Sequence, residues 1–229
     1  MAQVSGTYTV EQGMALARAS RLVRNEHLLL AARQITQKLT ASNIPYALMG
    51  GFSLSLRGSR RDTFDVDIAA GCNMLQLIQA VSNNERILRP LGPMSGVLRL
   101  FVQVESGNEP EIHVMVDLIL QGSLGAPSDL RTSSEAISIN TETGPQTFAV
   151  LNIKSIAESK LGAFFARGSS NDFTDIQFLI LTFPEKVYEI RAGLDQTHRQ
   201  HFANIFAQKR TDPSGRNLLK RVKQVLGVV

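Results

Sequence analysis

The chain of 229 residues contains a single cysteine, Cys72. One cysteine excludes an internal disulfide framework and any zinc cluster built from cysteine ligands. The four histidines show no spacing typical of a metal site, so we expect ordinary structural roles for them. Cysteine and histidine chemistry therefore does not point to the function of this sequence.

Long apolar runs and targeting signals are lacking as well. Residues 1–6 carry neither a basic nor an apolar segment and do not resemble a signal peptide. No apolar run approaches the length that spans a membrane, and we find no internal repeat. The apolar content of 43% with 19% charged residues is ordinary for a folded protein. We therefore expect a cytoplasmic protein without a membrane partner.

Runs of like charge are also missing, although the net charge is +4. A mildly basic protein favours polyanionic partners. The basic residues gather in two places, at Arg57, Arg60 and Arg61 and between residues 209 and 223. A solvated helix face and a nucleic-acid contact explain these clusters equally well.

Apolar periodicity predicts an α+β front half and a helical back half, with the boundary near residue 150. Two alternating runs, Val97–Val104 and Ile112–Leu120, predict a hairpin joined by a loop at 106–110. The other strands expected are 46–49, 64–69 and 147–150, and the helices are 11–41, 52–57, 74–82, 153–167, 172–182, 185–193, 196–208 and 215–226. We predict a core domain at 1–150 and a helical domain at 151–229, in which Phe164, Phe165, Phe173 and Phe178 are core residues.

Two carboxylates stand at alternating positions of the strand expected at 64–69. Because a strand points residues i and i+2 to one face, Asp65 and Asp67 project together. Phe64, Val66 and Ile68 are then expected to pack behind them. Adjacent carboxylates repel each other unless a cation lies between them, which is the arrangement of a Mg²⁺-nucleotide site. Asp117 projects from the polar face of a later strand, away from the apolar layer, which suits a cleft better than a core.

A glycine pair, Gly50–Gly51, precedes Asp65 with 13 residues between Gly51 and Asp65. Backbone N–H groups at a glycine-rich helix start can form a cradle for an anion, and the missing side chains let phosphates approach. The same pair can also serve as a simple strand-to-helix turn.

The order of these motifs resembles the nucleotidyltransferase superfamily of the DNA polymerase β type. The matching residues are Gly50, Gly51, Asp65, Asp67 and Asp117. Finer motifs resemble the minimal nucleotidyltransferases of the AbiEii toxin group, and the resemblance covers roughly residues 45–182. These motifs are Arg61-x-Thr63-x-Asp65-x-Asp67, Lys160 through Arg167, and Asp172 through Asp175.

The resemblance implies a mixed sheet with flanking helices and a Mg²⁺-dependent enzyme. Such an enzyme moves a nucleoside monophosphate from an NTP to an acceptor hydroxyl and releases pyrophosphate. The resemblance further implies an RNA acceptor, particularly a tRNA 3′ end, and a possible antitoxin-like partner protein. The implied ligands of two Mg²⁺ ions are Asp65, Asp67 and Asp117, and the implied nucleotide-binding residues are Gly50, Gly51, Ser53, Arg61, Lys160 and Asp172. We further hypothesise that Asp117 helps to deprotonate the acceptor.

Other interpretations stay open at this point. A small-molecule nucleotidyltransferase, similar to those that modify aminoglycosides or lincosamides, shares the same core motif. A non-catalytic nucleotide-binding module is a third possibility, because Phe52 stands where relatives often carry a hydroxyl. Arg61 can brace its loop through Asp62 or Asp65, Lys160 can be a surface lysine, and Asp172 can complement a helix N-terminus.

Overall fold

The computed structural model describes residues 6–82, 84–92, 95–105, 112–141 and 144–229. The chain divides into two compact units, 1–150 and 151–229, and each unit is described by itself. The predicted loop at 106–110 lies outside the described residues.

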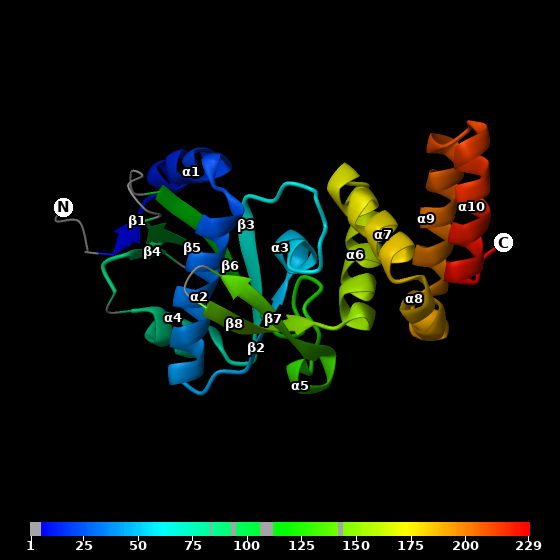
Figure 1. The fold of residues 1–229 in the computed structure, drawn as a ribbon. Coiled ribbons are helices and arrows are strands. Elements are labelled where there is room, and N and C mark those ends of the chain that lie inside the picture. The colour runs from blue at the N-terminus through cyan, green and yellow to red at the C-terminus, as the bar shows by residue number, and fades with distance from the viewer. Residues whose placement is uncertain (1–5, 83, 93–94, 106–111, 142–143) are drawn as a thin grey trace. The chain divides into compact units, whose positions relative to one another are not determined.

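The strands of the first unit form one sheet (Figure 1). They are β1 (Thr7–Tyr8), β2 (Tyr46–Met49), β3 (Asp65–Ala70), β4 (Ile87–Pro90), β5 (Val97–Val104), β6 (Ile112–Leu120), β7 (Ser134–Thr141) and β8 (Gly144–Leu151). Their order across the sheet is β1-β4-β5-β6-β3-β2-β8-β7. β3 pairs in parallel with β6 and antiparallel with β2, while β5 and β6 form the predicted antiparallel hairpin. The predicted α+β class with a mixed sheet and flanking helices is confirmed.

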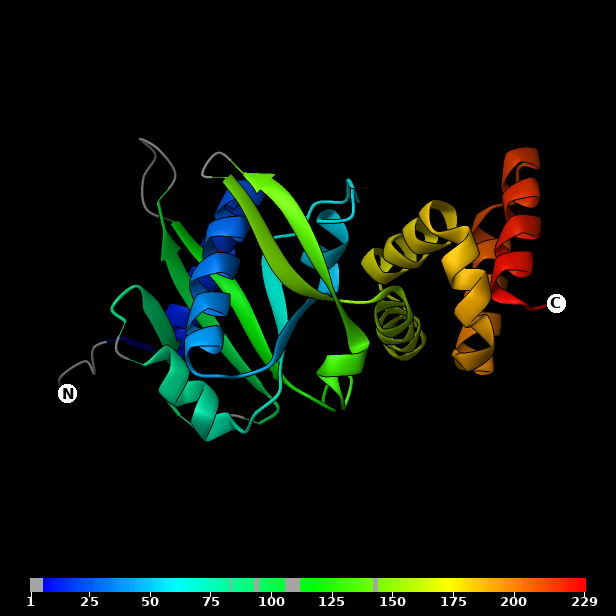
Figure 2. The same cartoon turned by 60° about the horizontal axis from the view of Figure 1, so that its bottom comes forward.

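The helices of the first unit cover the sheet so that its two faces differ: one packs against a helix, and the other bears Asp65 and Asp67. They are α1 (Val10–Ala19), α2 (Asn25–Ala41), α3 (Gly50–Ser55), α4 (Met74–Val81) and α5 (Leu130–Ser133). In Figures 1 and 2, α2 lies along the sheet, and its buried Leu28, Ile35 and Leu39 share one core with Val66 and Ile68 of β3. Burying each such side chain contributes about 1.5–3 kcal/mol. Because side chains alternate along a strand, Asp65 and Asp67 project from the opposite face.

The single long helix expected at 11–41 is wrong. A short 3-10 turn, Ser20–Leu22, follows α1, and Val23 is extended before α2 begins. The Ser20 hydroxyl donates to the carbonyl of Leu16 and also lies 2.8 Å from the carbonyl oxygen of His113 in β6. The break lets α1 and α2 make separate contacts with the sheet, and periodicity within the segment gives no sign of it.

Three other local expectations need correction. The strands β1, β4 and β7 were not expected, because β1 and β4 have only two and four residues and none of the residues of β7 is buried. The helix after β2 begins at Gly50 rather than at residue 52. Phe64 precedes β3 and is 42% exposed, so it does not pack behind the carboxylates as Val66 and Ile68 do.

The second unit contains only helices in its regular structure. They are α6 (Ile153–Arg167), α7 (Ser170–Thr182), α8 (Pro184–Ile190), α9 (Gln196–Lys209) and α10 (Pro213–Leu226), with a 3-10 turn at Arg191–Gly193. α9 and α10 lie side by side in Figures 1 and 2. Four of these helices begin after a polar residue whose side chain accepts a backbone N–H, which satisfies a donor that the helix itself cannot. These residues are Asn152, Ser169, Asp195 and Asp212.

Aromatic rings form much of the core of this helical unit. Phe164 and Phe173 are buried, and their ring centroids lie 5.7 and 5.2 Å from that of Phe202. Phe165, also expected in the core, is 46% exposed and stacks near the ring of His198 at the surface. The expectation for Phe165 was therefore wrong, because one step along a helix turns a side chain by about 100° and here takes Phe165 away from the core that holds Phe164.

None of the described helices combines the length and the hydropathy that a membrane-spanning helix needs.

Candidate active site

The turn between β2 and α3 brings a glycine against a carboxylate. Gly50 has a φ of +66°, a left-handed conformation that glycine adopts at little cost. A Cβ atom placed on Gly50 would lie 1.9 Å from Oδ2 of Asp67, which no side chain could tolerate without moving that carboxylate. Glycine is thus required at residue 50 both by backbone conformation and by the closeness of Asp67.

The three predicted aspartates meet on one face of two neighbouring strands. In the parallel pair of β3 and β6, Asp67 stands beside Asp117 and Asp65 stands beside Met115. The Oγ1 hydroxyl of the buried Thr63 donates to Oδ1 of Asp65 at 3.1 Å and orients it. We call the side of the sheet that bears Asp65, Asp67 and Asp117 the carboxylate face.

Arg99 is a member of this site that the sequence interpretation missed. It lies directly opposite Asp117 in the β5–β6 hairpin. Its Nε donates to Oδ1 of Asp117 at 2.8 Å, and its Nη2 donates to Oδ2 at 2.7 Å. Both carboxylate oxygens of Asp117 therefore accept from one guanidinium, in the bidentate geometry that makes such pairs strong. The side chain of Asp117 is 12% exposed and that of Arg99 is 49% exposed.

The register of the hairpin was the available signal for Arg99. Counting outward from the middle of the predicted loop at 106–110 places residue 99 opposite residue 117, which is the pairing observed. Residues opposite each other in an antiparallel pair project to the same face. A basic residue facing Asp117 could therefore have been found from sequence.

Charge and burial around Arg99 alter the titration of two groups. The hydrogen bonds to Asp117 raise the pKa of Arg99 above its ordinary value, despite the opposing effect of burial. Tyr8 donates from its hydroxyl to the backbone carbonyl of Arg99 at 2.9 Å. Burial raises the pKa of Tyr8 to about 12, with Arg99 acting to lower it and Asp117 to raise it. Arg99 thus stays charged at neutral pH beside a neutral phenol.

Arg61 and Ser53 occupy different surroundings near the glycine turn. A Cβ atom on Gly51 would lie 2.4 Å from Nη2 of Arg61, so the absence of a side chain lets the guanidinium approach this backbone. Arg61 also donates from Nη1 to the carbonyl of Asp62 at 2.7 Å, which braces the loop. Ser53 is fully buried, and its hydroxyl donates to the carbonyl of Gly50 at 3.0 Å.

The donor chemistry of the carboxylate face suits one hard divalent cation, because carboxylate oxygens are the ligands that Mg²⁺ prefers. Asp65 and Asp67 are partly exposed and adjacent on one strand face. Within the described ranges, however, no three Asp, Glu, His or Cys side chains are grouped closely enough to hold a metal. The two Asp117 oxygens already accept from Arg99. The residues therefore fit one ion at Asp65 and Asp67, and they do not fit a second ion on Asp117 in this arrangement.

Lys160 and Asp172 belong to an ionic cluster inside the helical unit. The Nζ of Lys160 lies 2.7 Å from Oδ2 of Asp175 and 3.3 Å from Oδ1 of Asp172. Arg167 reaches the other oxygen of Asp172 at 2.7 Å from the surface. Both aspartates are fully buried, and Lys160 is 7% exposed. We call Lys160, Arg167, Asp172 and Asp175 the buried ionic cluster; it joins α6 to α7.

Opposing effects act on Asp172 in this cluster. Burial alone would raise its pKa, but the hydrogen bond from Arg167 and the charge of Lys160 outweigh burial and hold the pKa of Asp172 below its ordinary value. The carboxylate is therefore ionised at neutral pH and fully engaged within the unit. In this arrangement, Lys160 and Asp172 join two helices, and their implied nucleotide contacts stay predictions.

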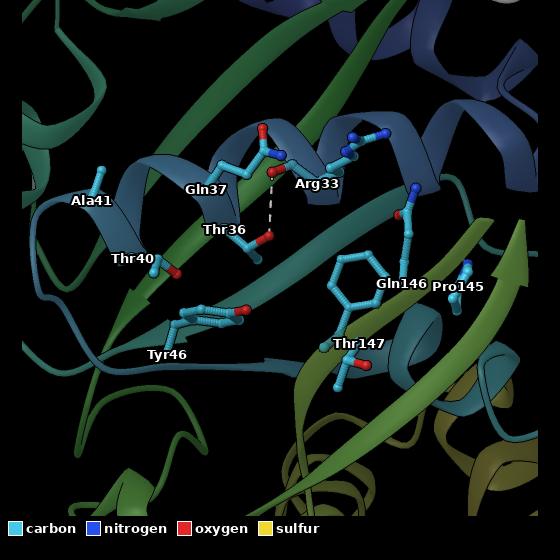
Figure 3. Close-up of a pocket in the computed structure, with 10 residues that line it drawn as sticks. Arg33, Thr36, Gln37, Thr40, Ala41, Tyr46, Pro145, Gln146 and Thr147 are labelled. Atoms are coloured by element: carbon cyan, nitrogen blue, oxygen red, sulfur yellow. Dashed lines mark hydrogen bonds between the residues drawn. The ribbon is translucent and has the colours of Figure 1, made fainter. Parts of the chain in front are cut away.

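A hollow of about 470 Å³ lies between α2, the start of β2 and β8 (Figure 3). The ten residues that line it include Arg33, Thr36 and Tyr46 but none of the predicted site residues. Because α2 forms one of its walls, the hollow lies on the side of the sheet opposite the carboxylate face. It is therefore distinct from the candidate active site.

Comparisons with known proteins agree with the fold. No family model matches the chain, and no curated protein matches its sequence. An antigenic nucleotidyltransferase-like protein from Paracoccidioides brasiliensis is similar in structure, with a TM-score of 0.57, 21% identity, and coverage of 84% of this chain and 91% of that chain. The antibiotic-resistance factor ANT(2'')-Ia is similar with a TM-score of 0.51 and 11% identity, over 82% of this chain and 100% of that chain.

A third match, the nucleotidyltransferase toxin MenT4 from Mycobacterium tuberculosis, is 14% identical over 93% of this chain and 87% of that chain. Its TM-score of 0.47 is too low to support an argument. At these identities the matches establish the fold alone. The first two matches share the fold of this chain, which is the fold that the order of the motifs predicted.

Proposed function

We propose that this protein is a Mg²⁺-dependent nucleotidyltransferase that moves a nucleoside monophosphate from an NTP to an acceptor hydroxyl. The observation that carries the proposal is the placement of Asp67 against Gly50 on one side and beside Asp117 on the other. In the reaction, the acceptor oxygen attacks the α-phosphorus, the bond from that phosphorus to the bridging oxygen breaks, and pyrophosphate leaves. The acceptor proton passes to Asp117 after it parts from Arg99, or to water.

In the proposed site, Asp65 and Asp67 would hold one divalent ion, which would neutralise charge on the phosphates. Gly50 and Gly51 leave room for phosphate oxygens beside the backbone, and Arg61 supplies a positive charge next to Gly51. Ser53 contributes indirectly, because its hydroxyl holds the carbonyl of Gly50 rather than facing solvent. Most of the rate acceleration in phosphoryl transfer comes from such positioning and charge neutralisation.

RNA is the proposed acceptor class, and the distribution of charge supports it. Residues 151–229 contain 12 Lys and Arg against 7 Asp and Glu, whereas residues 1–150 contain 12 against 13. The helix α10 has no acidic residue. The basic residues of α10 are Arg216, Lys220, Arg221 and Lys223, which we call the α10 basic face. Among the described residues, no carboxylate lies within 4.0 Å of these four side chains as an ion-pair partner. A row of uncompensated cations suits the phosphates of a nucleic acid.

The first test measures pyrophosphate release with Mg²⁺ and each of the four NTPs, with total tRNA present or absent. The double variant Asp65→Ala/Asp67→Ala serves as the blank. We expect release that requires tRNA and disappears in the variant, with the transferred nucleotide recovered on the RNA. Release that requires a small hydroxylated antibiotic instead would replace RNA with a small-molecule acceptor. Nucleotide binding without release under any condition would contradict the enzyme and favour a binding module.

The second test asks whether RNA contacts the α10 basic face. We expect the triple variant Arg216→Gln/Lys220→Gln/Lys223→Gln to lower the slope of log K against log salt by about 2, because each lost phosphate contact removes about 0.7–0.9. The triple variant Arg18→Gln/Arg21→Gln/Arg131→Gln removes the same charge from the first unit and is the matched control. Equal slopes for both variants would contradict a role for α10.

The implied antitoxin-like partner and cytoplasmic location also stay predictions. Copurification of the full chain with proteins encoded beside it would test the first.

A further inference from the structure

Arg99 and Asp117 form a complete bidentate pair at the point where a second cation would be expected. Their hydrogen bonds measure 2.8 and 2.7 Å and use both carboxylate oxygens. Asp117 is the direct neighbour of Asp67 across β3 and β6. A divalent ion bound at Asp67 would therefore share its surroundings with the guanidinium of Arg99.

An arginine cannot lose its charge in a protein, so it cannot yield to a second cation by deprotonation. A guanidinium and a divalent ion repel each other strongly at short distance, and the partial burial of Asp117 reduces the screening by water. The two cations are thus not bound tightly to Asp117 at the same time. One must leave, and Arg99 can do so by rotation of its side chain, which is 49% exposed.

The attachment of Arg99 to the rest of the first unit is consistent with such rotation. Its backbone is fixed by the β5–β6 pairing and by the hydroxyl of Tyr8, which donates to the Arg99 carbonyl. Rotation about side-chain bonds would therefore release Asp117 without disturbing the strand.

We propose that the guanidinium of Arg99 competes with a divalent ion for the carboxylate of Asp117. In the free protein, Asp65 and Asp67 hold one ion weakly while Arg99 neutralises Asp117. When Arg99 turns away, Asp117 becomes available as a ligand. The inference rests on the proposed function, since it concerns the same carboxylates, and it assigns to Arg99 a positioning role that sets metal affinity.

The test is a titration of the full-length protein with Mn²⁺ in the absence of nucleotide. Free Mn²⁺ is measured by electron paramagnetic resonance, so the readout does not depend on activity. We expect Arg99→Gln to bind Mn²⁺ at least about tenfold more tightly than the wild type, or to bind one more ion per chain, because it removes the competing charge. Arg99→Lys, which keeps the charge without the bidentate geometry, should fall between the two.

A double-mutant cycle separates competition for Asp117 from a general effect of charge. If Arg99 acts through Asp117, the gain from Arg99→Gln should shrink below about threefold in the Asp117→Asn background. The matched control is Arg86→Gln, which removes the same charge from the Arg86–Glu105 pair of 3.0 Å on the first unit. This control should leave Mn²⁺ affinity within about twofold of the wild type. A cooperative thermal unfolding transition would show that each variant is folded.

Three results would overturn the inference. They are equal Mn²⁺ binding by the wild type and Arg99→Gln, including no binding by either; an undiminished gain in the Asp117→Asn background; and an equal gain from Arg86→Gln. The proposed function fails on a different measurement, namely the absence of pyrophosphate release and of nucleotide transfer. Transfer activity with no effect of Arg99→Gln on Mn²⁺ binding would remove the inference and leave the function in place.

Discussion

The Arg99–Asp117 pair of the first unit and the buried ionic cluster of the second unit both join basic side chains to carboxylates, but in different surroundings. In the first unit, the cation is 49% exposed at its side chain and the carboxylate 12%. In the second unit, the side chain of Lys160 is 9% exposed and those of Asp172 and Asp175 are at most 1% exposed. Water can replace the partner of Asp117 if Arg99 rotates, but it has little access to the aspartates of the cluster. Burial therefore decides which carboxylates can exchange partners and which join helices permanently.

This difference separates residues that a single family resemblance had grouped together. Asp117 was expected to bind Mg²⁺ and to help deprotonate the acceptor, and Asp172 was expected to bind the nucleotide. Asp117 lies beside Asp67 across the sheet and is paired with the partly exposed Arg99. Asp172 lies where two cations already neutralise it. Four experiments can break or sharpen the comparison.

Lys160→Met should have the largest effect on stability. It leaves Asp172 and Asp175 buried with one fewer cation, and removing one partner of a buried pair costs about 3–5 kcal/mol. The free energy of unfolding, measured with urea, should fall by that amount. Lys154→Met is the matched control, since Lys154 and Glu158 form an exposed pair of 3.8 Å that is worth at most about 0.5 kcal/mol. A loss below about 1 kcal/mol for Lys160→Met would contradict a structural role.

Gly50→Ala should have the next largest effect on stability, and it should also displace a side chain of the carboxylate face. A left-handed backbone costs an alanine about 1–2 kcal/mol, and the new Cβ would also displace Asp67. Gly58→Ala isolates the first contribution, because Gly58 has a φ of +93° and nothing within 4 Å of the position of its Cβ. We expect Gly50→Ala to lose both stability and pyrophosphate release, while Gly58→Ala loses stability alone. Equal activity of the two variants would show that the contact with Asp67 is unimportant.

Arg99→Gln should destabilise the protein by only about 1 kcal/mol in the urea experiment, because the pair is open to water on the arginine side. The difference from Lys160→Met measures the effect of burial on two otherwise comparable ion pairs. If Arg99→Gln lowered the free energy of unfolding as much as Lys160→Met does, the Arg99–Asp117 pair would stabilise the fold as strongly as the buried ionic cluster. That outcome would also argue against exchange of Arg99 for a metal ion.

The smallest effect is confined to acidic pH and concerns Asp172. Its pKa is lowered in the folded state, since Arg167 and Lys160 outweigh burial. A lowered folded pKa stabilises the fold above the unfolded pKa of about 3.9, and this contribution disappears as the pH falls through the folded value. The melting temperature of the wild type should therefore fall more steeply below about pH 4 than that of Asp172→Asn. Parallel dependence of the two melting temperatures on pH would show that ionisation of Asp172 does not stabilise the fold.

Much of the candidate site followed from local pattern in the sequence. Alternation in β3 placed Asp65 and Asp67 on one face, and alternation in β6 placed Asp117 away from the apolar layer. The glycine pair before a short helix indicated the turn at residue 50. These features depend on neighbours within a few residues, so the chain itself specifies them.

Other features depended on contacts between distant segments. The break between α1 and α2 involves a hydrogen bond from Ser20 to His113, 93 residues away. Lys160 was expected to bind the nucleotide or to lie at the surface, but it is buried against two aspartates from α7. Nothing in the periodicity of α6 reveals those partners.

The sequence by itself determined the α+β class, the order of the motifs and the common face of Asp65 and Asp67, because strand and helix periods are local properties of the backbone. The hairpin register already placed residue 99 opposite residue 117, but only the tertiary structure decided how the charges are surrounded and buried. Asp117 meets Arg99 and Asp67 through the pairing of β6 with two strands, and Lys160 is buried by the packing of α7 on α6. The accessibility of a charge depends on which distant segments surround it, and that is a property of the folded chain rather than of any one stretch of residues.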